Sequence, residues 1–104
     1  MTTTTLAGRE LQVNEEGFLT DPTQWDKELA GVLAGQIGIT LTEAHWKAID
    51  FLRADHAATG QTPTLRRVST AGGIPIKELF GLFPKKPAKK MAYIAGLPKP
   101  VGCV

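Results

Sequence analysis

Apolar residues recur along this chain at two spacings, and the first of them is typical of β-strands. Residues 11–13 alternate between apolar and polar, 14–17 have the composition of a tight turn, and 18–19 begin a second apolar run. This pattern predicts a small N-terminal β-hairpin that must pack against helices, because two strands alone are marginally stable in water. The residues before it are mostly polar, and for 1–8 we predict a disordered N-terminal tail.

From residue 21 onward the apolar positions follow the period of an α-helix. Capping residues and glycines mark the ends of the helices, as at Thr42 before the longest helix and Gly60 after it. After a short helical turn through Trp25, the pattern predicts helices at about 26–36, 43–59, 65–70, 76–83 and 88–95. We interpret their apolar side chains as core, those of 76–83 included. The expected fold is mainly α, a compact helical bundle of about five helices with the small hairpin.

The chain ends in a segment that can neither continue a helix nor join the inside of a sheet. This segment, 96–104, has two glycines and two prolines, at Gly96, Pro98, Pro100 and Gly102. The prolines favour an extended form, and the glycines allow bending at the base and beside the only cysteine, Cys103. We therefore predict a single helical domain over 9–95 and a mobile C-terminal arm over 96–104 that holds a lone thiol away from the body.

Length and charge limit the classes of protein to consider. A chain of 104 residues suits one domain, and its single cysteine cannot form an internal disulfide. The sequence contains no secretory pattern and no apolar run of about 18 residues, so we expect a cytoplasmic protein. Its net charge is only +2, but no acidic residue follows Glu78. The later lysines at Lys85, Lys86, Lys89 and Lys90 are either a solvated face or a basic partner surface for an acidic protein or an anionic substrate.

Metal, cofactor and DNA sites receive little support. His45 and His56 are about 16 Å apart along one predicted helix, too far to share a metal ion, and no loop has the phosphate-binding pattern. We expect neither a metal nor a cofactor. The two short helices around residues 71–73 have the layout of a helix-turn-helix, but the second offers only Lys77 and Glu78 to base edges. Sequence-specific DNA binding by a regulatory protein is therefore the weaker alternative.

Several short motifs stand in an order known from one protein family. They are Glu15 to Leu19, Trp25, Leu41 to Trp46, Phe51 to Arg53, Pro63 to Arg66, Leu82 to Lys89, Ile94 to Pro100 and the penultimate Cys103. Over about residues 9–104 the chain resembles the DsrC/TusE family of sulfur carriers, the dissimilatory sulfite reductase gamma-subunit family. The resemblance implies a helical domain. It also implies that the sulfur donor and acceptor are proteins, either other relay proteins or a sulfur-metabolism enzyme.

The chemistry of a mobile thiol agrees with that resemblance. A thiolate can attack a sulfane sulfur on a donor cysteine, hold it as a persulfide and release it to an acceptor thiol. Cys103 would be the acceptor and donor of sulfur, and Lys99 a candidate partner for its thiolate. In this interpretation Gly96, Pro98, Pro100 and Gly102 shape the arm for contact with a partner. The protein would then be a sulfurtransferase-type carrier rather than a stand-alone catalyst.

One departure from the family pattern bears on the pathway. The members that work with dissimilatory sulfite reductase resemble this tail but carry a second cysteine eleven residues before the penultimate one, where this chain has Ala92. The resemblance thus favours the single-cysteine, TusE-like branch, which passes sulfur toward tRNA 2-thiouridine. A DsrC-like carrier of dissimilatory sulfur metabolism is the alternative. The link from Arg66 to Leu82 is also shorter than in the family. If this link forms part of a partner surface, the partner differs from those of the two branches.

Overall fold

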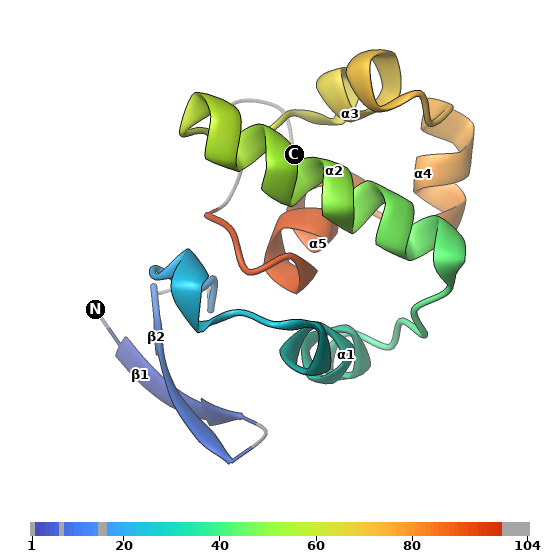
Figure 1. The fold of residues 1–104 in the computed structure, drawn as a ribbon. Helices are drawn as coiled ribbons and strands as arrows, with labels where there is room; N and C mark the ends of the chain where they lie inside the picture. Colours follow the sequence, from blue (N-terminus) through green and yellow to red (C-terminus); the bar gives the residue numbers. More distant parts are fainter. Residues whose placement is uncertain (1, 7, 15–16, 99–104) are drawn as a thin grey trace.

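The computed structural model describes residues 2–6, 8–14 and 17–98, and its first element is a two-stranded antiparallel hairpin (Figure 1). Strand β1, Thr2–Leu6, pairs with β2, Arg9–Val13, so that Thr2 lies opposite Val13. The hairpin is confirmed, and the expected strand at 11–13 lies within β2, but the expected partner strand was wrong. The predicted disordered tail contains β1, because a run of β-branched threonines suits an edge strand. The expected partner at 18–19 contributes only an isolated bridge between Leu19 and Val13.

Five α-helices make up most of the described chain, which confirms the predicted fold class. A 3-10 turn at Pro22–Gln24 precedes them, and they are α1 at Lys27–Gln36, α2 at Glu43–Thr59, α3 at Leu65–Gly72, α4 at Ile76–Leu82 and α5 at Pro87–Ile94. Their ends follow local rules. The Asp26 carboxylate accepts from the Leu29 backbone N–H at 2.9 Å, and Gly60 and Gly73 end α2 and α3 in the left-handed conformation. None of the helices in the described ranges is long and apolar enough to cross a membrane.

Helix α5 lies at the centre of the fold and contacts α1, α2 and α4 (Figure 1). Its inner side chains, Met91 and Ile94, are fully buried against Ile49 and Leu52 in the main core cluster. Leu97 belongs to the same cluster and is 1% exposed. The sequence assigned Leu97 to the arm, so the structure corrects the start of the arm: Gly96 and Leu97 are packed residues, and Pro98 is the first exposed one.

Helix α4 differs from the expectation that its apolar residues are core. Leu79 and the next inward residue, Phe83, are buried, because they lie four positions apart on one face. Ile76 and Phe80 are also four apart but lie on another face, where they are 44% and 49% exposed. A helix of seven residues buries one face only, so the prediction was wrong for these two side chains.

Candidate functional site: the base of the arm and a lysine pocket

Helix α5 ends in a tight turn that fixes where the chain leaves the body. The Leu97 N–H donates to the Ala92 carbonyl at 3.0 Å, and the Gly96 N–H donates to the Tyr93 carbonyl at 3.3 Å. This is the Schellman arrangement, with Gly96 in the left-handed conformation at φ 70°. A Cβ at Gly96 would lie 2.4 Å from Trp25 Cδ1, closer than side-chain atoms pack. Glycine is therefore required here by both backbone and space.

Trp25 and Arg53 hold the two backbone carbonyls next to this turn. Trp25 Nε1 donates to the Ile94 carbonyl at 2.7 Å, and Arg53 Nη1 donates to the Ala95 carbonyl at 2.7 Å. The Arg53 guanidinium also lies over the Trp25 ring, 4.1 Å from its centroid, as in a cation–π contact. Burial lowers the pKa of Arg53, but a guanidinium remains charged near neutral pH. The half-buried cation thus makes a charge-assisted bond to the end of α5.

A third carbonyl, that of Pro98, is held by the link between α2 and α3. Thr62 Oγ1 donates to the Pro98 carbonyl at 2.8 Å. That link is supported by Arg67, whose Nε and Nη2 donate to both carboxylate oxygens of Asp55 at 2.7 and 2.6 Å. These hydrogen bonds hold the pKa of Asp55 below its ordinary value. We call the side chains of Trp25, Arg53 and Thr62, with the backbone of 94–98 that they bind, the exit site.

The exit site is as far as the structure describes the predicted arm. Of the predicted arm residues, Gly96, Leu97 and Pro98 have described positions, while Lys99, Pro100, Gly102 and Cys103 lie outside the described residues. Cys103 is five positions beyond Pro98, so chain length limits the thiol to about 16–18 Å from the exit site.

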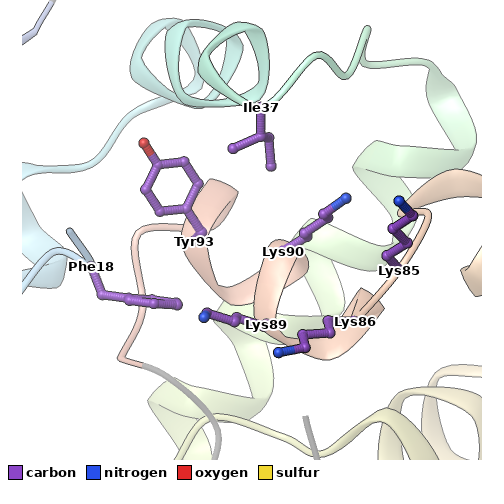
Figure 2. Close-up of a pocket in the computed structure, with 7 residues that line it drawn as sticks. All are labelled: Phe18, Ile37, Lys85, Lys86, Lys89, Lys90 and Tyr93. Atoms are coloured by element: carbon purple, nitrogen blue, oxygen red, sulfur yellow. The ribbon is translucent and has the colours of Figure 1, made fainter. Parts of the chain in front are cut away.

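The four predicted lysines gather around one pocket on the N-terminal half of α5. Figure 2 shows Lys85, Lys86, Lys89 and Lys90 around a hollow of about 510 Å³ that Phe18, Ile37 and Tyr93 also line. We call this hollow the lysine pocket. Two of its lysines have left-handed backbone, Lys85 at φ 58° and Lys86 at φ 47°. Within the described residues none of the four forms an ion pair, although Lys90 Nζ donates to the Pro84 carbonyl.

The histidines do not form a site with these groups. His45 is buried, and its Nδ1 accepts from the Thr42 backbone N–H at 3.1 Å while Nε2 lies 2.8 Å from the Leu82 carbonyl. Because a carbonyl can only accept, Nε2 carries the proton and links α2 to the end of α4, while Nδ1 caps the start of α2. Across the ranges that the structure describes, no three metal-binding side chains come together.

Sequence reasoning missed the roles of Trp25 and Arg53. Trp25 was interpreted as core and Arg53 only as part of a motif, because their contacts to Ile94 and Ala95 join residues 69 and 42 positions apart. The one local signal was Gly96, a glycine at the end of a predicted helix. It indicated a helix end, and nothing in the sequence indicated the indole ring beside it.

The comparisons with known proteins agree with the motifs. A family model described as "DsrC like protein" matches residues 5–104. The chain is 42% identical to Sulfurtransferase TusE of Yersinia pseudotuberculosis, covering 93% of this chain and 96% of that protein. It is 38% identical to Sulfurtransferase TusE of Escherichia coli (strain K12), with 93% and 95% covered.

Solved structures show the same likeness. The NMR structure of DsrC from Allochromatium vinosum is similar with a TM-score of 0.83 and 38% identity, over 98% of this chain and 97% of that chain. A crystal structure of dissimilatory sulfite reductase I (DsrI) is similar with a TM-score of 0.84 and 38% identity, over 99% and 100%. With a family match over nearly its whole length, the chain belongs to the DsrC-like protein family.

Proposed function

We propose that this protein, a sulfur carrier of the DsrC/TusE family, carries sulfur as a persulfide on Cys103 between two protein partners. One observation carries the proposal. The only cysteine of the chain stands five residues beyond Pro98, and the backbone up to Pro98 is fixed by Trp25, Arg53 and Thr62. A fixed base and a short remaining length confine the thiol to a defined region near one end of α5.

The transfer needs no outside oxidant or reductant. The Cys103 thiolate attacks the outer sulfur of a donor cysteine persulfide, the donor S–S bond breaks, and its electron pair leaves with the donor sulfur as a thiolate. Cys103 then holds the outer sulfur. An acceptor thiolate attacks that sulfur in the same way and returns Cys103 to the thiolate. The protein contributes the nucleophile and its position, and the partners contribute the rest.

The position of Ala92 favours a relay of the TusE type over a carrier of the sulfite-reductase type. Ala92 is fully buried on α5, at the position where the family resemblance expects a second cysteine in the sulfite-reductase branch. A single thiol can hold a persulfide but cannot close an internal disulfide. We therefore propose the tRNA 2-thiouridine relay as the pathway, with other relay proteins as donor and acceptor, in the reducing cytoplasm, where free thiols persist.

Intact-mass measurement after treatment with a small persulfide donor tests the assignment of Cys103. The wild-type chain should gain the mass of one sulfur atom, and Cys103→Ser should gain none, since a serine hydroxyl is not ionised near neutral pH. Circular dichroism of the variant controls for folding. Sulfur added to Cys103→Ser would refute the proposal.

A further inference from the structure

We propose that the lysine pocket is the docking site for an acidic segment of a partner protein, one that carries an apolar side chain between carboxylates. The inference rests on the proposed function, because it assigns the surface by which a sulfur donor or acceptor is held near the arm. It concerns recognition and not the transfer of sulfur itself.

The charge at this pocket has no balancing group in the described chain. The four lysines lie around the first turn of α5, whose N-terminus already carries the positive end of the helix dipole, and no acidic residue lies in that turn. Lys85 and Lys86 also have left-handed backbone, a conformation that residues other than glycine rarely adopt. Repulsion and strain at one place, with no ion pair among the described residues, are expected of a surface that binds an external anion.

One side of the pocket is apolar, which decides against a purely ionic partner. Phe18 and Tyr93 meet edge to face with centroids 5.9 Å apart, and Ile37 adds an aliphatic side. Figure 2 shows these three side chains on one side of the hollow, with the lysines along the other side. A volume of about 510 Å³ is in the range of sites that take up more than a single carboxylate. The ligand that fits has an apolar or aromatic group next to acidic ones.

The place of the pocket favours a protein over a nucleic acid. The lysines gather at one hollow, whereas binding along a phosphate backbone calls for a basic stripe and a larger net charge than +2. The pocket and the exit site also lie on the same helix, α5, which is eight residues or about 12 Å long. A partner held at the pocket therefore lies within the span that chain length allows Cys103.

Binding of a synthetic peptide to the full-length chain tests the docking site. The probe is a peptide with one phenylalanine flanked by glutamates, and its control has alanine for that phenylalanine. Nitrogen-15 NMR spectra should show shifts centred on residues 85–93 and Ile37, with the control peptide binding more weakly. Raising the salt concentration should weaken both, because the pairs are exposed.

Two matched charge reversals locate the binding. Two lysines are reversed together, because each exposed ion pair contributes little alone. The variant Lys86→Glu with Lys89→Glu should weaken binding of the phenylalanine peptide on the order of tenfold or more. The control, Lys47→Glu with Lys77→Glu, changes the net charge equally at exposed lysines outside the pocket and should leave affinity within about twofold. Equal weakening by both variants would show general charge attraction and overturn the proposal.

Further outcomes separate the rival occupants. Shifts centred on α3 and α4 would overturn the proposal, and so would tighter binding of a single-stranded RNA oligonucleotide at the same pocket. Peptide binding seen only after Glu15→Gln with Glu16→Gln would mean that the chain fills its own pocket, and would also overturn it. Loading of Cys103 by a small persulfide should be unchanged in the pocket variant. If the wild-type chain binds the peptide but Cys103 is not loaded by the small persulfide, the proposed function is refuted instead.

Discussion

The two ends of α5 contrast in how completely their polar groups are satisfied. At the C-terminal end, the backbone from Ala92 to Pro98 is bound by its own turn and by Trp25, Arg53 and Thr62. At the N-terminal end, four lysines gather around an open pocket without an ion pair in the described residues. Two of them have strained backbone. The polar backbone of the first end is satisfied within the chain, whereas the lysine charges of the second have no ion pair among the described residues.

We infer from this contrast that the C-terminal end of α5 stabilises the fold, and we propose that the N-terminal end binds a partner. Bonds at the exit site join residues far apart in sequence, so they contribute to stability, and in the proposed function they also aim the segment that leads to Cys103. At the lysine pocket, repulsion among the lysines and the left-handed backbone of Lys85 and Lys86 are unfavourable. Removing the charges of the pocket should therefore not destabilise the fold. Changes at the exit site should therefore alter both the stability of the fold and the aiming of the segment that leads to Cys103.

Truncating the buried side chain of Leu97, next to the exit site, should have the largest effect on stability. Leu97→Ala leaves a cavity in the main core and should lower the free energy of unfolding by about 3 kcal/mol. The adjacent exposed residue is the control, and Pro98→Ala should cost less than about 1 kcal/mol. Urea unfolding measures both. Equal, small costs would mean that Leu97 is not packed as described and that the arm starts at Gly96.

A side chain at Gly96 should strain the backbone and collide with Trp25. Gly96→Ala should cost about 2–3 kcal/mol, from the left-handed conformation and from the 2.4 Å approach together. Gly73→Ala is a matched control, because Gly73 has φ 72° and open space beside it, and should cost only about 1 kcal/mol. Thermal melts of the pair isolate the contact with the ring. The idea fails if the two variants melt alike.

Loss of the cation at the exit site should loosen the end of α5. Arg53→Gln removes the charge-assisted bond to the buried Ala95 carbonyl and the contact with the Trp25 ring, and should cost about 2 kcal/mol. Sulfur transfer from a protein donor should slow more than transfer from a small persulfide, because only the first needs the arm to be aimed. Arg66→Gln, at an exposed arginine, is the control. A proportional loss of both reactions would argue against aiming.

The smallest effect is a change with pH at the pair that supports Thr62. Hydrogen bonds from Arg67 lower the pKa of Asp55, so its contribution to stability is fully present above the unfolded value near 3.9 and is lost as pH falls through the lower folded value. The stability difference between wild type and Asp55→Asn should shrink below about pH 4. Urea unfolding over a pH series measures it, and a constant difference would rule the pair out as the cause.

Local sequence rules predicted the helices and the presence of a hairpin. The cap at Thr42 and the glycine at Gly60 act within one helix turn, so their effect is visible in the sequence. The pairing of β1 was missed, because polar threonines give no alternating pattern. The burial of Leu97 and the bonds of Arg53 depend on tertiary contacts that no local pattern encodes.

The residues of the candidate site were likewise predicted only in part. The lysines and Cys103 were found from composition and from a family resemblance, and the lysines do gather around one pocket. The apolar side of that pocket could not be predicted, because Phe18 and Ile37 come from distant segments that the fold brings to α5.

The most direct test of the carrier role is a load-and-discharge experiment followed by intact mass. The chain is loaded with one sulfur on Cys103, freed of donor and mixed with a cysteine-containing acceptor peptide. Carrier chemistry predicts that the chain returns to its starting mass while the peptide gains one sulfur atom, because the acceptor attacks the outer sulfur. A mixed disulfide between chain and peptide, with release of sulfide, would show attack on the inner sulfur and contradict the carrier role.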